Sequence, residues 1–184
     1  MSVELIAETT TNHGGSIALA KEFIWAYAEA GADFVKFQLT RARRLSQYDP
    51  QRAWFEQAEF TLEQFAELRN ECHLANVKFL LTAFHPDDVA AVASLGLKAI
   101  KIGSGEAGDY KMAEAIRKAG FLRVIASCGL KIPGNWFGGA RVDLLRCVTR
   151  YPCPSACAIG NYDGMPFRGW SDHADGIEGC KIAI

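Results

Sequence analysis

Two lysines in this sequence lie inside short apolar runs, where a charged side chain is unexpected. Lys36 lies in the run Phe34–Gln38, and Lys101 lies in the run Ala99–Ile102. An ammonium group is rarely buried without a partner, because removing it from water without compensation is costly. Lys36 therefore predicts a nearby anion, which is either a bound ligand or the Glu8 carboxylate in a structural ion pair. Lys101 is expected to supply a point charge for phosphate or carboxylate.

The segment after Lys101 is built for close approach to an anion. It reads Gly-Ser-Gly-Glu over residues 103–106. Glycines let backbone N–H groups come near a ligand, and the hydroxyl of Ser104 adds a further donor. The alternative is a tight turn between a strand and a helix that carries a surface lysine. Glu106, at the end of the segment, is a candidate acid or base.

Polar residues also follow the first and the last apolar runs. Glu8 precedes the segment TTTNHGG at residues 9–15, which is typical of a binding loop but also fits an N-cap network around Ser16. Ser171 and His173 would share one face of a strand, because side chains alternate along it. A histidine there is a metal ligand, a proton carrier or simply a hydrogen-bonded side chain.

The hydrophobic pattern predicts the elements that must position these residues. Apolar runs predict seven strands at residues 5–7, 34–38, 77–82, 99–102, 123–127, 144–148 and 169–173. Amphipathic segments predict helices at residues 16–30, 61–75, 86–95 and 111–119, with a stop at Gly31 and a capping box between Thr61 and Gln64. Residues 41–60 are expected to form a long loop. No helix is expected between strands five and six or between strands six and seven.

Alternating strands and helices predict an α/β fold with a parallel sheet, either open and doubly wound or closed into a barrel. Polar residues follow the carboxyl end of nearly every strand, which is how (β/α) barrels build their sites. These residues are Glu8, Lys36, Thr82, Lys101, Ser104, Ser127, Tyr151 and His173. We therefore expect a TIM-type barrel that is incomplete or minimal, with about seven parallel strands, as a single domain over residues 1–184.

Composition narrows the class of protein further. The chain has 184 residues, a formal net charge of −1 and 49% apolar residues, so bulk charge indicates neither a nucleic-acid partner nor a membrane surface. It shows no signal peptide and no apolar run of about 20 residues, so we expect a cytoplasmic protein. The six cysteines are expected to be reduced and mostly buried, and Cys147, Cys153 and Cys157 fit no zinc spacing.

Taken together, these segments resemble the N-acetylneuraminate (sialic acid) synthase family. The matching segments occur in family order from end to end of the chain, which makes the set specific. They are Ala7-Glu8, Asn12-His13-x-Gly15-Ser16, Gly31-Ala32-Asp33-x-Val35-Lys36-Phe37-Gln38, Thr82-x-Phe84, Lys101-Ile102-x-Ser104-x-Glu106, Ser127-x-Gly129, Cys147 with Tyr151-Pro152-x-Pro154, and Gly169-x-Ser171-Asp172-His173-x-x-Gly176-Ile177-Glu178.

The resemblance implies a transferase of carbohydrate biosynthesis with a (β/α)₈ barrel. Such enzymes condense phosphoenolpyruvate with an N-acylated aminosugar aldehyde of the mannosamine type, giving a nine-carbon acid and phosphate, with a divalent metal (Mn or Mg) on the aldehyde. By match, the catalytic residues would be Glu8 and Glu106, and the metal ligand would be His173. The substrate-binding residues would be Lys36, Thr82, Lys101, Ser104, Ser127, Tyr151 and Ser171.

The sequence also departs from the family pattern. The helices after strands five and six look shortened, Thr149 and Arg146 replace a frequent asparagine and histidine, and the second metal histidine and the antifreeze-like domain have no counterpart. We therefore expect a homo-oligomer or a subunit completed by another chain. Two alternatives stay open: a non-catalytic module that binds phosphoenolpyruvate or phosphate, and an unrelated aldolase with Lys36 or Lys101 as a Schiff-base lysine.

Overall fold

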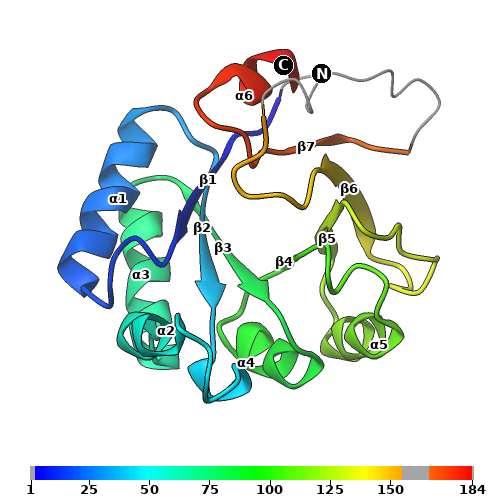
Figure 1. The fold of residues 1–184 in the computed structure, drawn as a ribbon, viewed down its shortest axis with the longest axis horizontal. Helices are drawn as coiled ribbons and strands as arrows, with labels where there is room; N and C mark the ends of the chain where they lie inside the picture. The colour runs from blue at the N-terminus through cyan, green and yellow to red at the C-terminus, as the bar shows by residue number, and fades with distance from the viewer. Residues whose placement is uncertain (1–2, 155–165, 184) are drawn as a thin grey trace. The chain divides into compact units, whose positions relative to one another are not determined.

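The computed structural model describes residues 3–154 and 166–183, in which strands and helices alternate (Figure 1). The chain divides into two compact units. The first comprises Met1–Ala83 and Ala91–Leu97, and the second comprises Phe84–Ala90 and Lys98–Ile184. One domain over residues 1–184 stays a prediction.

The first unit is a three-stranded parallel sheet with helices against it. Its strands are β1 (Ile6–Thr10), β2 (Phe34–Leu39) and β3 (Lys78–Ala83), and β2 pairs in parallel with both neighbours. The helices α1 (Ile17–Glu29) and α3 (Leu62–Leu74) lie side by side (Figure 1). They bury Ile24, Phe65 and Leu68, so these apolar side chains form the core of the unit.

The helix ends follow the predicted signals. The Ser16 hydroxyl caps α1 by accepting from Leu19 N at 3.2 Å. Thr61 and Gln64 form the reciprocal capping box of α3. Gly31 follows α1 at φ 88°, a left-handed conformation that glycine adopts without strain.

The prediction of an irregular loop over residues 41–60 was wrong. That segment contains the 3-10 helix η1 (Ala42–Arg44) and the helix α2 (Arg52–Ala58). The second helix has two turns, too short for its periodicity to be detected, and it is held by tertiary bonds. Trp54 Nε1 donates to Thr11 Oγ1 at 3.0 Å and Gln57 Nε2 to Gly14 O at 3.2 Å.

The second unit carries the other four strands of the described chain. These are β4 (Ala99–Ile102), β5 (Arg123–Cys128), β6 (Arg141–Cys147) and β7 (Gly169–Ser171), paired in parallel in that order. The helical elements are η2 (Pro86–Asp88), α4 (Val89–Ser94), α5 (Tyr110–Ala119) and α6 (Glu178–Ala183). Residues 91–94 of α4 belong to the first unit.

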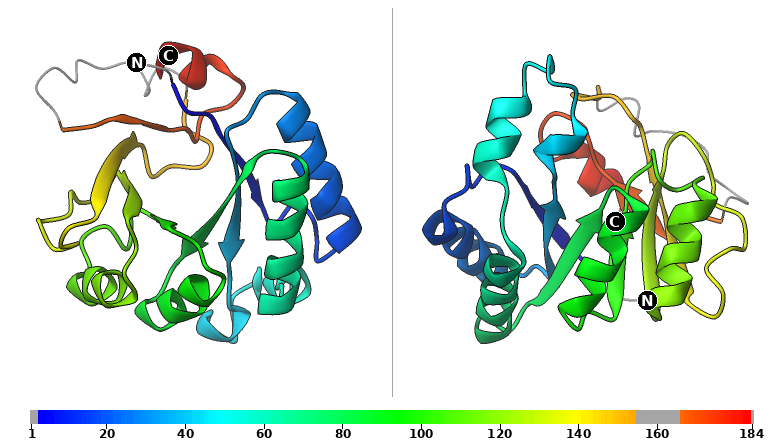
Figure 2. Two further views of the ribbon diagram at one scale, coloured as in Figure 1. Left: turned by 180° about the vertical axis from the view of Figure 1, so that it is seen from behind. Right: turned by 90° about the horizontal axis from the view of Figure 1, so that it is seen from below.

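The connections of the second unit match the sequence in part. As predicted, residues 129–140 between β5 and β6 contain no helix and are drawn as a loop in Figure 2. Helix α6 was not predicted, and β7 ends at Ser171, two residues before the predicted end. The connection between β6 and β7 includes residues 155–165, and Cys157 among them, which lie outside the described residues. None of the helices within the described residues is long and apolar enough to cross a membrane.

A buried carboxylate ties the starts of the last three strands together. Asp143 is 2% exposed and pairs with Arg123 Nε at 2.6 Å and Arg141 Nε at 2.9 Å, with Arg168 Nε at 3.9 Å. The sequence reading missed it because it started strand six at Leu144. This cluster lies at the end of the strands opposite to the residues with predicted chemistry.

We expect Asp143→Ala to destabilise the protein by about 2–4 kcal/mol, because it removes the buried partner of several guanidinium groups. Urea unfolding would measure the loss. The matched control is Glu114→Ala, which breaks the exposed Glu114–Lys118 pair and should change stability little. Equal effects of the two substitutions would show that the Asp143 cluster is not structural.

Candidate active site

In the first unit, the strands bring Glu8, Lys36 and Thr82 together. Lys36 Nζ forms an ion pair with Glu8 Oε2 and donates to Thr82 Oγ1 at 3.4 Å. The register places Glu8 opposite Lys36, and Gln38 opposite Thr82. Because side chains alternate, the lysine and the threonine share one face of the sheet, while Phe37 is buried on the other. Of the two partners left open for Lys36, a bound anion and Glu8, the structure shows the ion pair with Glu8, and a role in anion binding stays a prediction.

A break in β1 fixes the carboxylate of Glu8. The pairing register shifts between Glu8 and Thr10, and Thr10 has φ 48°. Its N–H donates to Glu8 Oε1 at 2.9 Å. The two carboxylate oxygens therefore have different partners, a backbone N–H and the Lys36 ammonium, so both the charge and the orientation of Glu8 are held.

The loop after β1 is organised around the buried His13. Its Nδ1 accepts from Gly15 N at 3.1 Å, and its ring stacks on Phe60 with centroids 4.2 Å apart. Burial lowers the pKa of His13, which keeps the ring neutral and able to accept. Gly15 has φ 84°, and a Cβ there would lie 2.1 Å from Gln57 O, so only glycine fits. The His13-x-Gly15 pattern thus shapes the loop.

In the second unit, Lys101 lies at the centre of the predicted site. It is 5% exposed, and its Nζ donates to Ser127 Oγ at 2.7 Å and to Ile102 O at 2.6 Å. An ammonium has three donor hydrogens. These two bonds leave one N–H of Lys101 for a bound anion.

Burial perturbs the two ionisable groups of this cluster in the directions that keep them neutral. Desolvation lowers the pKa of Lys101 to about 8, although electrostatic interactions with Cys147, Cys128 and Glu106 oppose this shift. Desolvation likewise raises the pKa of Glu106, although backbone hydrogen bonds and Lys101 oppose it. A carboxyl group with a raised pKa beside a lysine with a lowered pKa is suited to moving protons near neutral pH.

Ser104 is held between two neighbouring strands. Its Oγ accepts from Gly129 N at 3.0 Å and lies 2.8 Å from Cys147 Sγ. Gly129 has no room for a side chain, since a Cβ would lie 2.6 Å from Thr149 Cγ2 and 2.8 Å from that sulfur. No site role was predicted for Cys147, which appeared only as an expected buried thiol without a zinc spacing and as part of a family motif. It lies two residues after Leu145, which pairs with Ser127, and this spacing places it on the same face as Ser127.

Tyr151 and His173 form a second pair in the same unit. Tyr151 Oη lies 2.6 Å from His173 Nε2, and His173 Nδ1 lies 2.6 Å from Val148 O. A carbonyl only accepts, so Nδ1 carries the proton and Nε2 of the neutral ring accepts from the tyrosine hydroxyl. His173 lies beyond the end of β7, while Ser171, in β7, is opposite Cys147 in the register.

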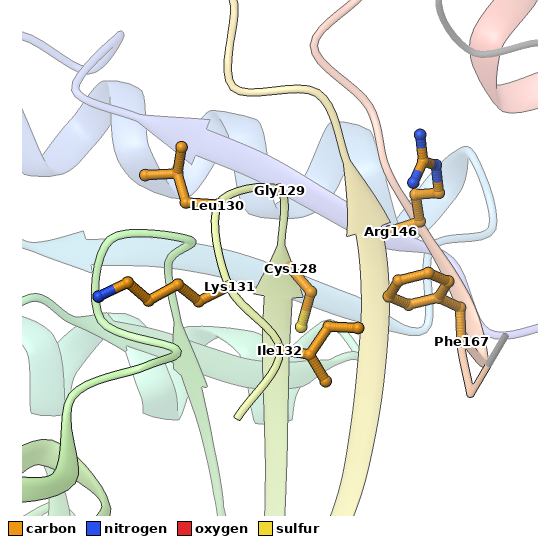
Figure 3. A pocket seen from close by; sticks show the side chains of 7 residues that line it. All are labelled: Cys128, Gly129, Leu130, Lys131, Ile132, Arg146 and Phe167. Atoms are coloured by element: carbon orange, nitrogen blue, oxygen red, sulfur yellow. The ribbon is translucent and has the colours of Figure 1, made fainter. Parts of the chain in front are cut away.

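A small pocket opens on the other face of β5 and β6. It has a volume of about 180 Å³ and is lined by Cys128, Gly129, Leu130, Lys131, Ile132, Arg146 and Phe167. Figure 3 shows Cys128, Ile132 and Phe167 beside one another, with the Lys131 and Arg146 side chains pointing apart. Ser127 and Cys147 alternate with Cys128 and Arg146, so the lysine cluster faces away from this pocket.

The described residues do not make a metal site by themselves. Among them, no group of three or more His, Cys, Asp or Glu side chains could hold an ion. His173, the predicted ligand, has both ring nitrogens in hydrogen bonds. Metal binding through Nε2 would require Tyr151 to give up its bond and further ligands from outside the described residues.

Comparison with known proteins decides the family. A family model described as the NeuB family matches residues 23–184. The chain belongs to the NeuB family. The family predicted from the ordered motifs is thereby confirmed.

Several relatives of this NeuB chain carry names of acidic-sugar synthases. The N,N'-diacetyllegionaminic acid synthase of Campylobacter jejuni is 31% identical over 212 residues, covering 98% of this chain and 63% of the relative. The N-acetylneuraminate-9-phosphate synthase of Drosophila melanogaster is 30% identical and covers 100% of this chain and 57% of the relative. The chain thus spans less than two thirds of these proteins. The first alignment exceeds the 184 residues of this chain, so it contains gaps in the chain.

Solved structures confirm the fold class. The N-acetylneuraminic acid synthetase of Leptospira borgpetersenii, solved with citrate, matches with a TM-score of 0.83 and 27% identity over 97% of this chain and 67% of that one. A truncated 3-deoxy-D-arabino-heptulosonate 7-phosphate synthase of Thermotoga maritima shares the fold with a TM-score of 0.58 over 83% of this chain and 54% of that one, at 13% identity. The NeuB chain therefore has the predicted α/β fold of the (β/α)-barrel type.

We expect Lys101→Met to raise the free energy of unfolding by about 1–3 kcal/mol at pH 7, because it removes a charge that burial disfavours. Between pH 8 and pH 10.5, which is its pKa in the unfolded chain, Lys101 binds fewer protons in the folded state than in the unfolded state. The wild-type penalty is therefore complete below pH 8 and disappears as the pH rises towards 10.5. Urea unfolding of both proteins across this range would test it. A gain that did not shrink with rising pH would show that the ammonium is not the cause.

Proposed function

We propose that this chain is the phosphoenolpyruvate-binding part of an acidic-sugar synthase. It condenses phosphoenolpyruvate with an N-acylated aminosugar aldehyde of the mannosamine type, giving a nine-carbon acid and phosphate. The observation that carries the proposal is the buried Lys101, which donates to Ser127 within a cluster that also holds Ser104. The names of the relatives support the product class. The identity of the sugar is not part of the proposal.

The two lysine clusters suit the charge of the proposed substrate. Phosphoenolpyruvate carries about three negative charges in a small volume, so its desolvation needs several charged donors. Lys101 retains an N–H for such an anion, and the hydroxyl of Ser104, which accepts from the Gly129 N–H, is a second proposed donor. In the first unit, Lys36 and Thr82 stay proposed phosphoenolpyruvate contacts.

The proposed reaction balances without an added oxidant or reductant. The methylene carbon of phosphoenolpyruvate attacks the aldehyde carbon and a C–C bond forms. The π bond of the aldehyde breaks towards its oxygen, which takes a proton and becomes a hydroxyl, and positive charge is left on the enol-ether carbon. Water adds to that carbon, and its bond to the phosphate oxygen breaks to give the 2-keto acid and inorganic phosphate. Glu8 and Glu106 are proposed to stabilise the cation and to move the protons, and the raised pKa of Glu106 suits the proton transfer.

The remaining residues are proposed for the sugar. Tyr151 is 75% exposed, and its oxygen, whose hydrogen is donated to His173, is proposed to accept from a sugar hydroxyl. Ser171 stays a proposed phosphoenolpyruvate contact. A role for His173 as a Mn or Mg ligand also stays a proposal. Its missing co-ligands would have to come from outside the described residues, from a second copy of this chain or from another chain.

A second candidate function is binding of phosphoenolpyruvate or phosphate without turnover. The observation that favours it is the closed Tyr151–His173 pair, in which both histidine nitrogens are occupied. An assay of phosphate release with N-acetylmannosamine and manganese separates the two candidates. Release that depends on the sugar supports the synthase. Binding of phosphoenolpyruvate without release supports the module.

Calorimetric titration of phosphoenolpyruvate, with and without manganese, tests the proposal. We expect wild type to bind and Lys101→Ala to bind about 10–100-fold more weakly, the loss typical of a charged hydrogen bond. Lys131→Ala, which removes a lysine of the opposite face, is the matched control and should bind like wild type. Equal losses in both variants would show non-specific charge attraction, and no binding by wild type would overturn the function.

We expect phosphoenolpyruvate affinity to fall as the pH rises through about 8, because the pKa of Lys101 is lowered to about 8 and the neutral amine attracts an anion less. Titrations between pH 7 and 9.5 would show the decline. An arginine stays charged over this range, so Lys101→Arg should lose the pH dependence even if it binds more weakly. The same pH profile in both proteins would assign the dependence to another group.

A further inference from the structure

The thiol of Cys147 lies in the proposed anion site but has no role in the proposed function. It is 3% exposed, and its Sγ lies 2.8 Å from Ser104 Oγ. Within the described residues, Ser104 is the one side chain that forms a hydrogen bond with it. The function of this contact depends on which atom donates.

Counting hydrogens decides the donor. A serine hydroxyl has one hydrogen and two lone pairs, and one lone pair of Ser104 already accepts from Gly129 N at 3.0 Å. If Ser104 donated to the sulfur, its only hydrogen would be used and the buried S–H would lack an acceptor. If Cys147 donates, the second lone pair is filled and both groups are satisfied.

We propose that Cys147 is a positioning residue, whose S–H donates to Ser104 and thereby leaves the Ser104 hydroxyl proton for an oxygen of bound phosphoenolpyruvate. The inference rests on the proposed function. Two donors, the Gly129 N–H and the Cys147 S–H, then fix the oxygen from two sides. The Ser104 O–H then points in the one remaining direction, where it donates to a bound anion.

The local sequence builds this arrangement. Ser127 pairs with Leu145 in the register of β5 and β6, so Cys147 extends the same face two residues further. Gly129 brings its backbone N–H to Ser104 because it carries no Cβ that would strike the Cys147 sulfur at 2.8 Å. The thiol, the glycine and the serine therefore depend on one another.

The arrangement predicts different results for three substitutions. Cys147→Ala removes the donor, frees a lone pair of Ser104 and should weaken phosphoenolpyruvate binding about 3–10-fold, the range of a net hydrogen bond. Cys147→Ser keeps a hydrogen-bond donor, on a C–O bond that is about 0.4 Å shorter than the C–S bond. It should bind phosphoenolpyruvate within about twofold of wild type. Cys128→Ala, which removes the neighbouring buried thiol on the opposite face, should bind like wild type.

A double-mutant cycle tests whether Cys147 acts through Ser104. Phosphoenolpyruvate would be titrated into wild type, Cys147→Ala, Ser104→Ala and the double variant, with thermal unfolding of each as the check on folding. We expect the cysteine substitution to cost nothing further once Ser104 is absent. Cys147→Val would replace the alanine variant if that variant did not fold.

The outcomes separate this inference from the proposed function. Binding by wild type, weakening by Cys147→Ala, rescue by Cys147→Ser and loss of the effect without Ser104 support it. An effect that persists in the Ser104→Ala background shows that the thiol only packs, and the inference fails while the function stands. Equal binding by wild type and Cys147→Ala also contradicts the inference and leaves the proposed function standing. No binding by wild type overturns both.

Discussion

The arrangement of this protein depends on the cost of burying two lysines at the ends of parallel strands. Each ammonium leaves water in the folded state, and each is compensated by its own partners. Lys36 pairs with Glu8 and reaches Thr82, whereas the hydrogen-bond acceptors of Lys101 among the described residues are neutral, namely the Ser127 hydroxyl and a backbone carbonyl. Neutral acceptors do not cancel the charge, which is why desolvation lowers the pKa of Lys101 to about 8.

The polar structure around each lysine follows from that cost. In the first unit, the irregularity of β1 turns the N–H of Thr10 onto the Glu8 carboxylate, so the partner of Lys36 is itself fixed. In the second unit, the Ser127 hydroxyl and the Ile102 carbonyl accept from Lys101 in place of a carboxylate, and the Gly129 N–H orients the hydroxyl of Ser104. The ion pairs of Asp143 with three arginines lie at the opposite ends of the strands. A site left short of negative charge is one that an anionic ligand completes.

The sequence predicted what is encoded locally. The strands, the capped helices and the Glu8–Lys36 pair follow from apolar runs, cap residues and the cost of a buried lysine, and the ordered motifs identified the family. Helix α2 was missed because it is held by Trp54 and Gln57 bonding to a distant loop. Tyr151 and His173 were predicted separately. Their hydrogen bond depends on the pairing of β6 with β7, the strands that they follow, and no local pattern contains that pairing. The roles of the predicted site residues stay predictions, since position alone does not test them.

Alternation along the strands explains how a connection without a helix leaves this face of the sheet unchanged. Ser127 and Cys147 lie on one face of β5 and β6, and Cys128 and Arg146 lie on the other, beside the pocket lined by Ile132 and Phe167. A helix after these strands would pack on the second face, and the loop at 129–140 takes its place there, leaving Leu130 and Ile132 exposed. Without such a helix, less apolar area is buried on the second face. The donors on the first face keep their positions, because the register of the strands sets them. Stability and the anion-binding chemistry are thus separable in this fold, and shortened connections are compatible with an intact Lys101 cluster.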